Sequence, residues 1–297
     1  MSLRVNPNQT PDLFAALDTA QKQRDAALLQ LGTGRRVNTP SDDPAAAAQV
    51  VANHDLSSQV DSYQSNATSV SGEQQAVDST LSSVVTALQR AISLGVQGAN
   101  GGTLSDSNRG AIADELRGIQ SQLISLANLS YQGRFVFSGT KQARPYVADT
   151  STASGVRYDG NTGVNTVTIG NGYQLQVNLP GSQVFSSPSA DMFKAINDLT
   201  NAVQINSGVD VALGEVRQAF DFVTAQRVFY GNGLNQIQAQ QTFLDNTKTQ
   251  LSSQENVLAG ADIAAAASQV VDTENARNAT LAAIGRVSQS TLFDFLR

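Results

Sequence analysis

One long apolar repeat, from Val209 to Leu258, constrains the fold of this 297-residue chain more than any other feature. Alternating steps of four and three residues select fifteen positions along it, and eleven of these are apolar or aromatic. The spacing is the heptad pattern of a helix that buries one narrow seam along its whole length. At about 1.5 Å per residue such a helix would be roughly 75 Å long, so it needs a partner of similar length. The fifteen positions are Val209, Leu213, Val216, Phe220, Val223, Arg227, Tyr230, Leu234, Ile237, Gln241, Leu244, Lys248, Leu251, Glu255 and Leu258.

A second seam of the same spacing follows Pro44 and supplies that partner. Its positions are Leu56, Val60, Tyr63, Ala67, Val70, Gln74, Val77, Leu81, Val84, Leu88 and Ala91. We expect glycines at 95, 98, 101 and 102 to end this helix. A third helix, from about residue 105 to 131, repeats the pattern and returns antiparallel as a helical hairpin.

The period changes to that of strands after residue 134. Residues 134–138, 156–158, 165–169 and 173–179 are typical of strands, and Asn171-Gly172 has the turn chemistry of a hairpin. In the last segment Tyr173, Leu175, Val177 and Leu179 alternate with Gln174, Gln176 and Asn178. A short helix is expected from Asp191 to Ile205.

The two ends of the chain are predicted to be amphipathic helices that lack a local partner. The first covers Pro11 to Leu31, and the last begins at a capping Asp262 and reaches the C-terminus. In a monomer this C-terminal helix would expose many apolar side chains to water. The exposure indicates that the helix packs against another copy of the chain. The residues predicted to form this assembly interface are Leu13, Phe14, Leu17, Leu28, Leu31, Leu281, Ile284, Val287, Leu292, Phe295 and Leu296.

The predicted fold class is therefore mainly α. The N- and C-terminal segments form a long antiparallel helical bundle or coiled coil, with a small β-rich domain inserted in the middle. Residues 1–45 and 260–297 are expected to be terminal segments that are disordered before assembly. Residues 46–134 and 188–259 are expected to form the bundle, and residues 135–187 the β-rich outer domain.

The segment from Arg35 to Pro44 connects the first two helices and is extended by its two prolines. Asp43 can cap the following helix while Pro44 takes the first helical position. The adjacent carboxylates Asp42 and Asp43 could also form a metal or acid–base pair. Capping, with a salt bridge to Arg35 or Arg36, is the preferred interpretation, because no histidine or third carboxylate follows at ligand spacing.

The charge, cysteine content and apolar runs of the sequence limit which partners and ligands the chain is expected to bind. The net charge is −6, only 15% of residues are charged, and no large cluster of Lys and Arg exists, so nucleic acid is not expected as a partner. The absence of cysteine excludes disulfides and thiolate ligands. The N-terminus has no apolar core of a cleavable signal peptide, and no apolar run approaches the roughly 20 residues of a membrane span. We expect no membrane insertion.

An enzyme is a poorer interpretation of the remaining polar motifs. His54 is the sole histidine, and no motif supplies the partners that a triad or metal site needs. Gly231-Asn232-Gly233 interrupts a helix instead of opening one after a strand, so it is not a phosphate-binding loop. A local kink or close packing explains it better. We therefore expect no catalysis and no cofactor.

Several motifs, in the right order, resemble the bacterial flagellin superfamily. The phrase Gly34-Arg-Arg-Val-Asn-Thr-Pro-Ser-Asp-Asp-Pro resembles the motif after the first helix of that family. The runs that begin Ala261-Asp-Ile-Ala and Val287-Ser-Gln-Ser resemble its C-terminal helix. Within the superfamily, residues 127–141 and the segments at Tyr158-Asp-Gly and Leu179-Pro-Gly are similar to the proteins of the hook–filament junction.

This resemblance implies a structural protein of the flagellum, outside the cell. The terminal helices would pair at the inner wall of the tube, with Arg35, Arg36, Asp42, Asp43 and Pro44 in a connecting spoke. Subunits would leave through the flagellar type III export apparatus with a chaperone on the C-terminal helix. They would then form a ring with one another, between hook-associated protein 1 and the flagellin filament.

Two other interpretations belong to non-enzymatic classes. A minor flagellin would polymerise without limit, but the short insert and the phrase from Phe135 to Lys141 argue against it. A generic coiled-coil tip or adhesion protein would explain the seams, although not the motifs at the two ends.

Overall fold

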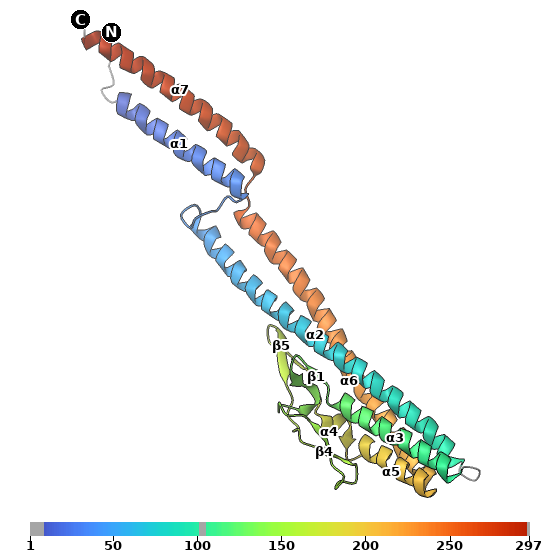
Figure 1. Cartoon of the computed structure of the whole chain (residues 1–297). Helices are drawn as coiled ribbons and strands as arrows, with labels where there is room; N and C mark the ends of the chain where they lie inside the picture. The colour runs from blue at the N-terminus through green and yellow to red at the C-terminus, as the bar shows by residue number, and fades with distance from the viewer. Residues whose placement is uncertain (1–8, 101–104, 296–297) are drawn as a thin grey trace. The chain divides into compact units, whose positions relative to one another are not determined.

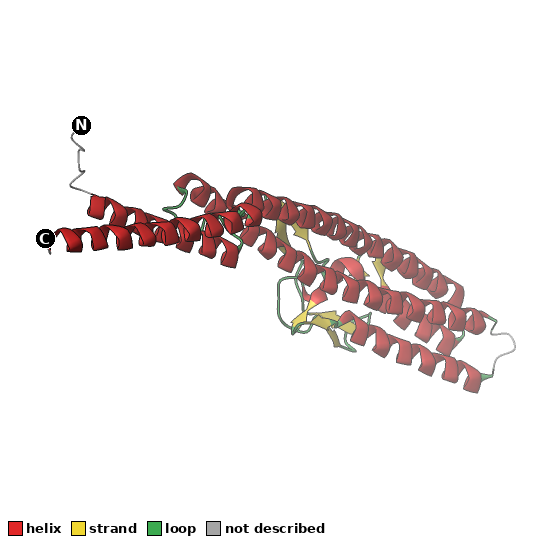
Figure 2. Ribbon diagram, turned by 90° about the horizontal axis from the view of Figure 1, so that it is seen from above, coloured by secondary structure: helices red, strands yellow, loops and turns green. Residues whose placement is uncertain are grey.

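The computed structural model describes the backbone of residues 9–100 and 105–295, and the side chains of residues 11–100 and 105–286. Seven α-helices and eight short strands are present in this part of the chain (Figures 1 and 2), and the predicted mainly helical fold class with a small β-rich domain is confirmed. The chain forms two compact units, one of residues 60–246 and the other of residues up to 59 together with those from 247 onward. The domain limits proposed from the sequence concern order before assembly and stay a prediction.

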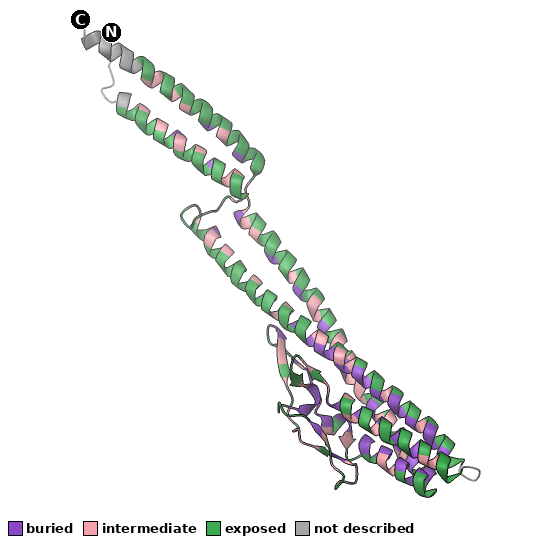
Figure 3. Ribbon diagram, viewed as in Figure 1, coloured by how far each residue is buried: buried purple, intermediate pink, exposed green. Residues whose placement is uncertain are grey.

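The bundle unit is built from parts of α2 (Pro44–Ala99) and α6 (Val209–Ala259), with α3 (Asp106–Ala127) and α5 (Met192–Ile205). The predicted seam of α6 is confirmed here, since Leu213, Val216, Val223 and Tyr230 are all buried. Figure 3 shows the buried residues gathered where these helices face one another. Burying one such side chain stabilises the fold by about 1.5–3 kcal/mol.

Short polar side chains fix where the bundle helices begin and end. Ser105 accepts a hydrogen bond from Asn108 N at the start of α3, and Asp191 accepts one from Lys194 N at the start of α5. Asn206 ends α5 in the left-handed conformation. α3 is shorter than predicted and ends at Ala127, because Tyr131 has already entered a strand.

Two of the glycines predicted to end the second helix have a different role. α2 continues to Ala99, so Gly95 and Gly98 lie inside it. A Cβ on Gly95 would be 2.8 Å from Leu213 Cδ1, and one on Gly98 would be 2.7 Å from Val203 Cγ2. These glycines therefore let α5 and α6 approach α2 closely. Gly101 and Gly102 lie outside the described residues.

The β-rich domain consists of four separate antiparallel strand pairs. They are β1 (Ser130–Tyr131) with β2 (Arg134–Phe135), β3 (Tyr146–Ala148) with β4 (Val156–Tyr158), β5 (Thr166–Gly170) with β6 (Tyr173–Gln176), and β7 (Ser186–Ser187) with β8 (Ala190–Asp191). A short helix, α4 (Gly181–Val184), lies between the third and fourth pairs in sequence. Buried aromatic rings join these pieces to α5, as in the contact of Tyr146 with Phe193, whose ring centroids are 4.9 Å apart.

Three details of the predicted strands need correction. The strand expected over residues 134–138 ends at Phe135, and Val136–Ser138 form a 3₁₀ helix, because all three are buried and a strand would turn alternate residues outward. Tyr173 is exposed, unlike the other three residues of its predicted face, and its hydroxyl group is 3.0 Å from Gln236 Oε1. Asn178 is buried, where its Oδ1 accepts a hydrogen bond from Asn165 N.

The β-rich domain is tied to the bundle by buried hydrogen bonds. Gln74 Nε2 on α2 donates to Val177 O at 2.8 Å, and Leu179 N donates to the hydroxyl of Tyr230 on α6 at 3.1 Å. Burial raises the pKa of Tyr230, so this hydroxyl stays protonated. Among the described helices, none is both long enough and apolar enough to span a membrane.

Replacing Gly98 by alanine tests the close contact between α2 and α5. Since the β-branched Val203 cannot easily move aside, Gly98→Ala should lower the free energy of unfolding by about 1–3 kcal/mol in urea denaturation followed by circular dichroism. Gly118→Ala is the matched control, because nothing lies within 4 Å of its added Cβ. That change should stabilise α3 by about 0.5–1 kcal/mol. Equal stability of the two variants would contradict the close contact.

Candidate assembly interface

The terminal unit is organised around α1 (Gln9–Thr33) and α7 (Ile263–Phe295), which run antiparallel side by side (Figure 1). Each helix turns a stripe of four–three spacing towards the other. The stripe of α1 is Leu13, Leu17, Ala20, Arg24, Ala27 and Leu31, and that of α7 is Ala266, Val270, Thr273, Arg277, Thr280 and Ile284. Only Ala20, Ala27, Ala266 and Thr273 among these are fully buried. The pair is thus held by small side chains and has little apolar area to bury.

The residues predicted for the inner coiled coil fall into three groups. Leu13, Leu17, Leu31 and Ile284 lie in the stripes and are half-buried. Phe14, Leu28 and Leu281 lie outside the stripes and are 55%, 46% and 41% exposed. Val287, Leu292, Phe295 and Leu296 lie outside the residues whose side chains are described.

Three more large apolar side chains are exposed on the same helices: Leu29, Ile263 and Val271. Sequence reasoning did not single out these positions for the interface, because it assigned each terminal helix one apolar face. The signal was available, since both helices carry more apolar residues than one stripe can hold. We define the terminal apolar surface as Phe14, Leu28, Leu29, Ile263, Val271 and Leu281.

The spoke is fixed at one end by the backbone of a distant segment. Arg36 N donates a hydrogen bond to Ala259 O at 2.7 Å, and Ala261 N donates one to Gly34 O at 3.0 Å. These two bonds form an antiparallel bridge between Arg35 and Gly260. We call residues 34–36 and 259–261 the neck of the terminal unit.

Side chains of the two spoke arginines reinforce the neck. Arg36 donates to Asp43 Oδ2 at 3.1 Å and to Leu258 O at 2.9 Å. Arg35 pairs with Glu255 of α6, and the same carboxylate lies 3.3 Å from His54 Nε2. The predicted salt bridge to Arg35 or Arg36 is therefore formed by Arg36, whereas Arg35 reaches a carboxylate more than two hundred residues away in sequence.

The adjacent aspartates have separate structural roles. Asp43 Oδ1 accepts a hydrogen bond from Ala46 N at 3.0 Å and so caps α2, whose first residue is Pro44. Asp42 Oδ2 accepts hydrogen bonds from the backbone N–H groups of Asn38 and Thr39, at 2.9 and 2.8 Å. In the same segment Val37 is buried against Ala46 and Ala259. The geometry is that of a capped, hydrogen-bonded turn.

These contacts lower the pKa of both carboxyl groups. For Asp42 the main cause is the hydrogen bond from the Thr39 backbone, followed by that from Asn38. For Asp43 the main cause is the hydrogen bond from the Ala46 backbone, followed by that from Arg36. No group of three or more His, Asp or Glu able to hold a metal ion occurs among the described residues.

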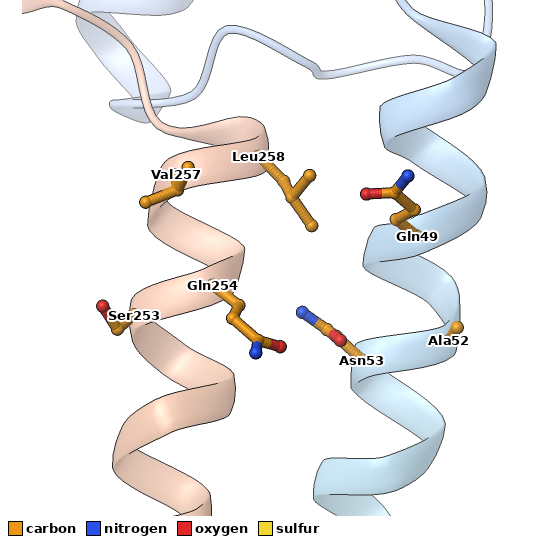
Figure 4. A pocket seen from close by; sticks show the side chains of 7 residues that line it. All are labelled: Gln49, Ala52, Asn53, Ser253, Gln254, Val257 and Leu258. Atoms are coloured by element: carbon orange, nitrogen blue, oxygen red, sulfur yellow. The ribbon is translucent and has the colours of Figure 1, made fainter.

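The other enzyme candidates also have structural surroundings. His54 is exposed on α2 and contacts Glu255. Nearby, a pocket of about 380 Å³ lies between α2 and α6 (Figure 4), lined by Gln49, Ala52, Asn53, Ser253, Gln254, Val257 and Leu258. In the bundle unit α6 runs through Gly231 and Gly233 without a break, and a Cβ on Gly233 would lie 3.4 Å from Gln74 Oε1. That is an ordinary contact distance, and nothing lies within 4 Å of a Cβ on Gly231, so the structure shows neither a kink nor close packing at this motif.

Comparison with known families shows which class of protein this chain resembles. The family model described as the bacterial flagellin N-terminal helical region matches residues 11–142. Two curated relatives are more particular, and both are named flagellar hook-associated protein 3. The relative from Salmonella typhimurium is 36% identical over 160 residues, which are 53% of this chain and 49% of the relative. The relative from Escherichia coli is 40% identical over 113 residues, which are 38% of this chain and 35% of the relative. The aligned part of the chain thus spans about half the length, or less, of these relatives.

Solved structures agree on the fold. A flagellar hook-associated protein from Vibrio parahaemolyticus matches with a TM-score of 0.67 and 22% identity, over 73% of this chain and 99% of that one. The flagellar junction protein FlgL from Legionella pneumophila matches with a TM-score of 0.61 and 14% identity, over 71% of this chain and 100% of that one. The resemblance inferred from the motifs is confirmed. The relatives' names describe parts of a flagellum, which agrees with the expectation that the chain is not an enzyme.

The lowered pKa values of Asp42 and Asp43 make the spoke sensitive to acid. A carboxylate whose pKa is lower in the folded chain stabilises the fold above its unfolded pKa, and this contribution is lost as pH falls through the folded value. We expect NMR shifts of the Asn38, Thr39 and Ala46 amides to titrate with midpoints below 3.8, the ordinary value for aspartate.

Single substitutions assign each midpoint. Asp42→Asn should abolish the titration at Asn38 and Thr39 and leave that at Ala46, whereas Asp43→Asn should do the reverse. Midpoints at or above the ordinary value would show that these hydrogen bonds do not form in solution.

Proposed function

We propose that this chain is a structural subunit of a bacterial flagellum that forms the ring at the junction between hook and filament. Its similarity to proteins named flagellar hook-associated protein 3 supports the placement. The observation that carries the assembly role is the terminal apolar surface, where six large apolar side chains are exposed on two thinly packed helices. Exposed apolar residues grouped on one element mark an interaction site.

Each neighbour in the proposed ring follows from this placement. Copies of the chain pack laterally through the terminal apolar surface. Hook-associated protein 1 lies on the hook side and flagellin on the filament side. Subunits reach that position through the type III export apparatus, with a chaperone that covers the C-terminal helix, and the ring lies outside the cell.

The terminal helices of the free subunit are proposed to become ordered only on assembly. α1 and α7 meet mainly through alanine, threonine and half-buried leucine, so few apolar contacts offset the entropy of ordering them. The bundle unit has a large buried core and does not share this weakness.

Limited proteolysis of the purified monomer tests that ordering. Cuts should remove roughly residues 1–45 and 260–297 and leave one stable core, identified by mass. Protected ends, with cleavage confined to residues 135–187, would show that the terminal helices pack stably in the monomer. That result would favour the coiled-coil tip or adhesion interpretation.

A double substitution tests the terminal apolar surface in cells. A strain that lacks its own copy of this gene should regain filaments and swimming with the unaltered chain. Phe14→Ser with Leu28→Ser should reduce filament number at least about tenfold, since loss of an interface anchor costs about 1–2 kcal/mol or more. The change should not alter unfolding of the bundle unit, because both residues lie in the terminal unit.

Ile205→Ser is the matched control, because Ile205 is also large, apolar and exposed but lies in the bundle unit. It should leave filament number unchanged. An equal loss from the control would point to general instability rather than assembly. Labelled protein spread along the whole filament, instead of at its base, would favour the minor flagellin.

A further inference from the structure

The stripes by which α1 and α7 meet each contain one arginine, Arg24 and Arg277. Both side chains are half-buried in a seam otherwise made of small and apolar residues. A charged group in such a seam needs a partner, because burial removes part of its hydration. The two arginines differ in whether they have one.

Arg24 is paired within its own helix. Its Nε and Nη2 lie 3.2 and 2.9 Å from Asp25 Oδ1. Arg277 has no hydrogen bond and no ion pair with any described residue, and its Nε is buried without a partner. Because the residue as a whole is only half-buried, a carboxylate that approaches from outside the helix pair can reach the guanidinium.

The same helix carries a complementary charge without a partner. Glu274 is exposed, and among the described residues it forms no ion pair. Three residues apart, Glu274 and Arg277 are close enough in sequence for a pair within one helix. That pair is absent, since Arg277 lies in the seam towards α1 while Glu274 lies outside the stripe.

The surroundings of Glu274 indicate that its side of α7 is covered in the assembled protein. At helical spacing it shares that side with Ile263 and Leu281, both members of the terminal apolar surface. If a second copy covers this surface, Glu274 is buried with it and requires a cation. Among the described residues of the terminal unit, Arg277 and Arg286 are the two cations that form no ion pair, and of these only Arg277 has a buried nitrogen without a partner. Arg277 of that second copy is therefore the cation that Glu274 would meet.

We infer that Arg277 of one subunit forms an ion pair with Glu274 of a neighbouring copy of this chain. The inference rests on the proposed function, and it names the contact that would align neighbouring subunits in the assembly. An arginine and a carboxylate form a directional, bidentate ion pair. Apolar surfaces slide easily along one another, whereas a single charged pair at a fixed height sets the axial position of each subunit against the next.

Charge reversal in whole cells tests the pair. In the complementation strain, Arg277→Glu should reduce filament number at least about tenfold, because it places two carboxylates together at each contact. Adding Glu274→Arg in the same chain reverses both partners and should restore most filaments. Arg286→Glu is the matched control, since Arg286 is an exposed arginine on α7 outside the stripe, and it should have no effect.

The possible outcomes separate this inference from the proposed function. If the unaltered chain does not restore filaments, the proposed function fails. If the unaltered chain works and Arg277→Glu works equally well, the ion pair is excluded. Rescue by Asp272→Arg instead of Glu274→Arg would overturn Glu274 as the partner.

A cross-linking measurement covers the case in which a charge-reversed chain is not exported. The chain contains no cysteine, so single cysteines introduce a unique reactive site. Chains with Arg277→Cys and chains with Glu274→Cys, expressed together, should give a mixed dimer with a short bis-maleimide reagent in isolated flagella. The pair Arg286→Cys and Glu274→Cys should give at least about fivefold less dimer. Equal yields from the two pairs would exclude the inferred contact.

Discussion

The four–three seam of α6 is the constraint on which the bundle unit depends. From Val209 to Leu244 every position of the repeat is buried or half-buried, including the polar Arg227 and Gln241, so a single side of the helix is covered throughout. α2 provides the cover with a seam of matching period, and α3 and α5 complete the core. The β-rich domain then needs no large core of its own, because Val177 and Leu179 are bonded directly to Gln74 and Tyr230 of the seam helices.

In the terminal unit the same spacing gives a different result. The stripes of α1 and α7 have the period of a coiled coil, but alanine and threonine occupy their buried positions. Small residues allow close approach and remove little apolar area from water. Large apolar residues occur on these helices as well, and several are turned outward. The bundle unit is therefore complete within one chain, whereas the terminal unit has its larger side chains available to another.

The sequence allowed the helices and their inward positions in the bundle to be predicted, because periodicity repeated over many turns is a strong signal. Asp43 and Asp262 were also predictable as caps, because capping depends on residues only a few positions away. Gly95 and Gly98 were misinterpreted because a glycine that ends a helix and one that admits a neighbouring helix look alike in sequence. The inward face of α7 was hard to assign, since Ala264 to Ala267 give every side of the helix a similar character. Contacts such as Arg35 with Glu255 join residues remote in sequence and leave no local pattern.

The backbone bridge at the neck has a mechanical consequence. α1 ends and α7 begins next to the same two hydrogen bonds, so a force carried by either helix reaches both strands of the neck together. Two bonds loaded in parallel must break at once, whereas bonds loaded in series open one after another. Arg36 extends the fastening, because it holds the carbonyl of Leu258 and the carboxylate of Asp43. A twist or pull on the terminal helices is thereby delivered to the start of α2 and the end of α6 together, and the connecting segments do not carry the load alone.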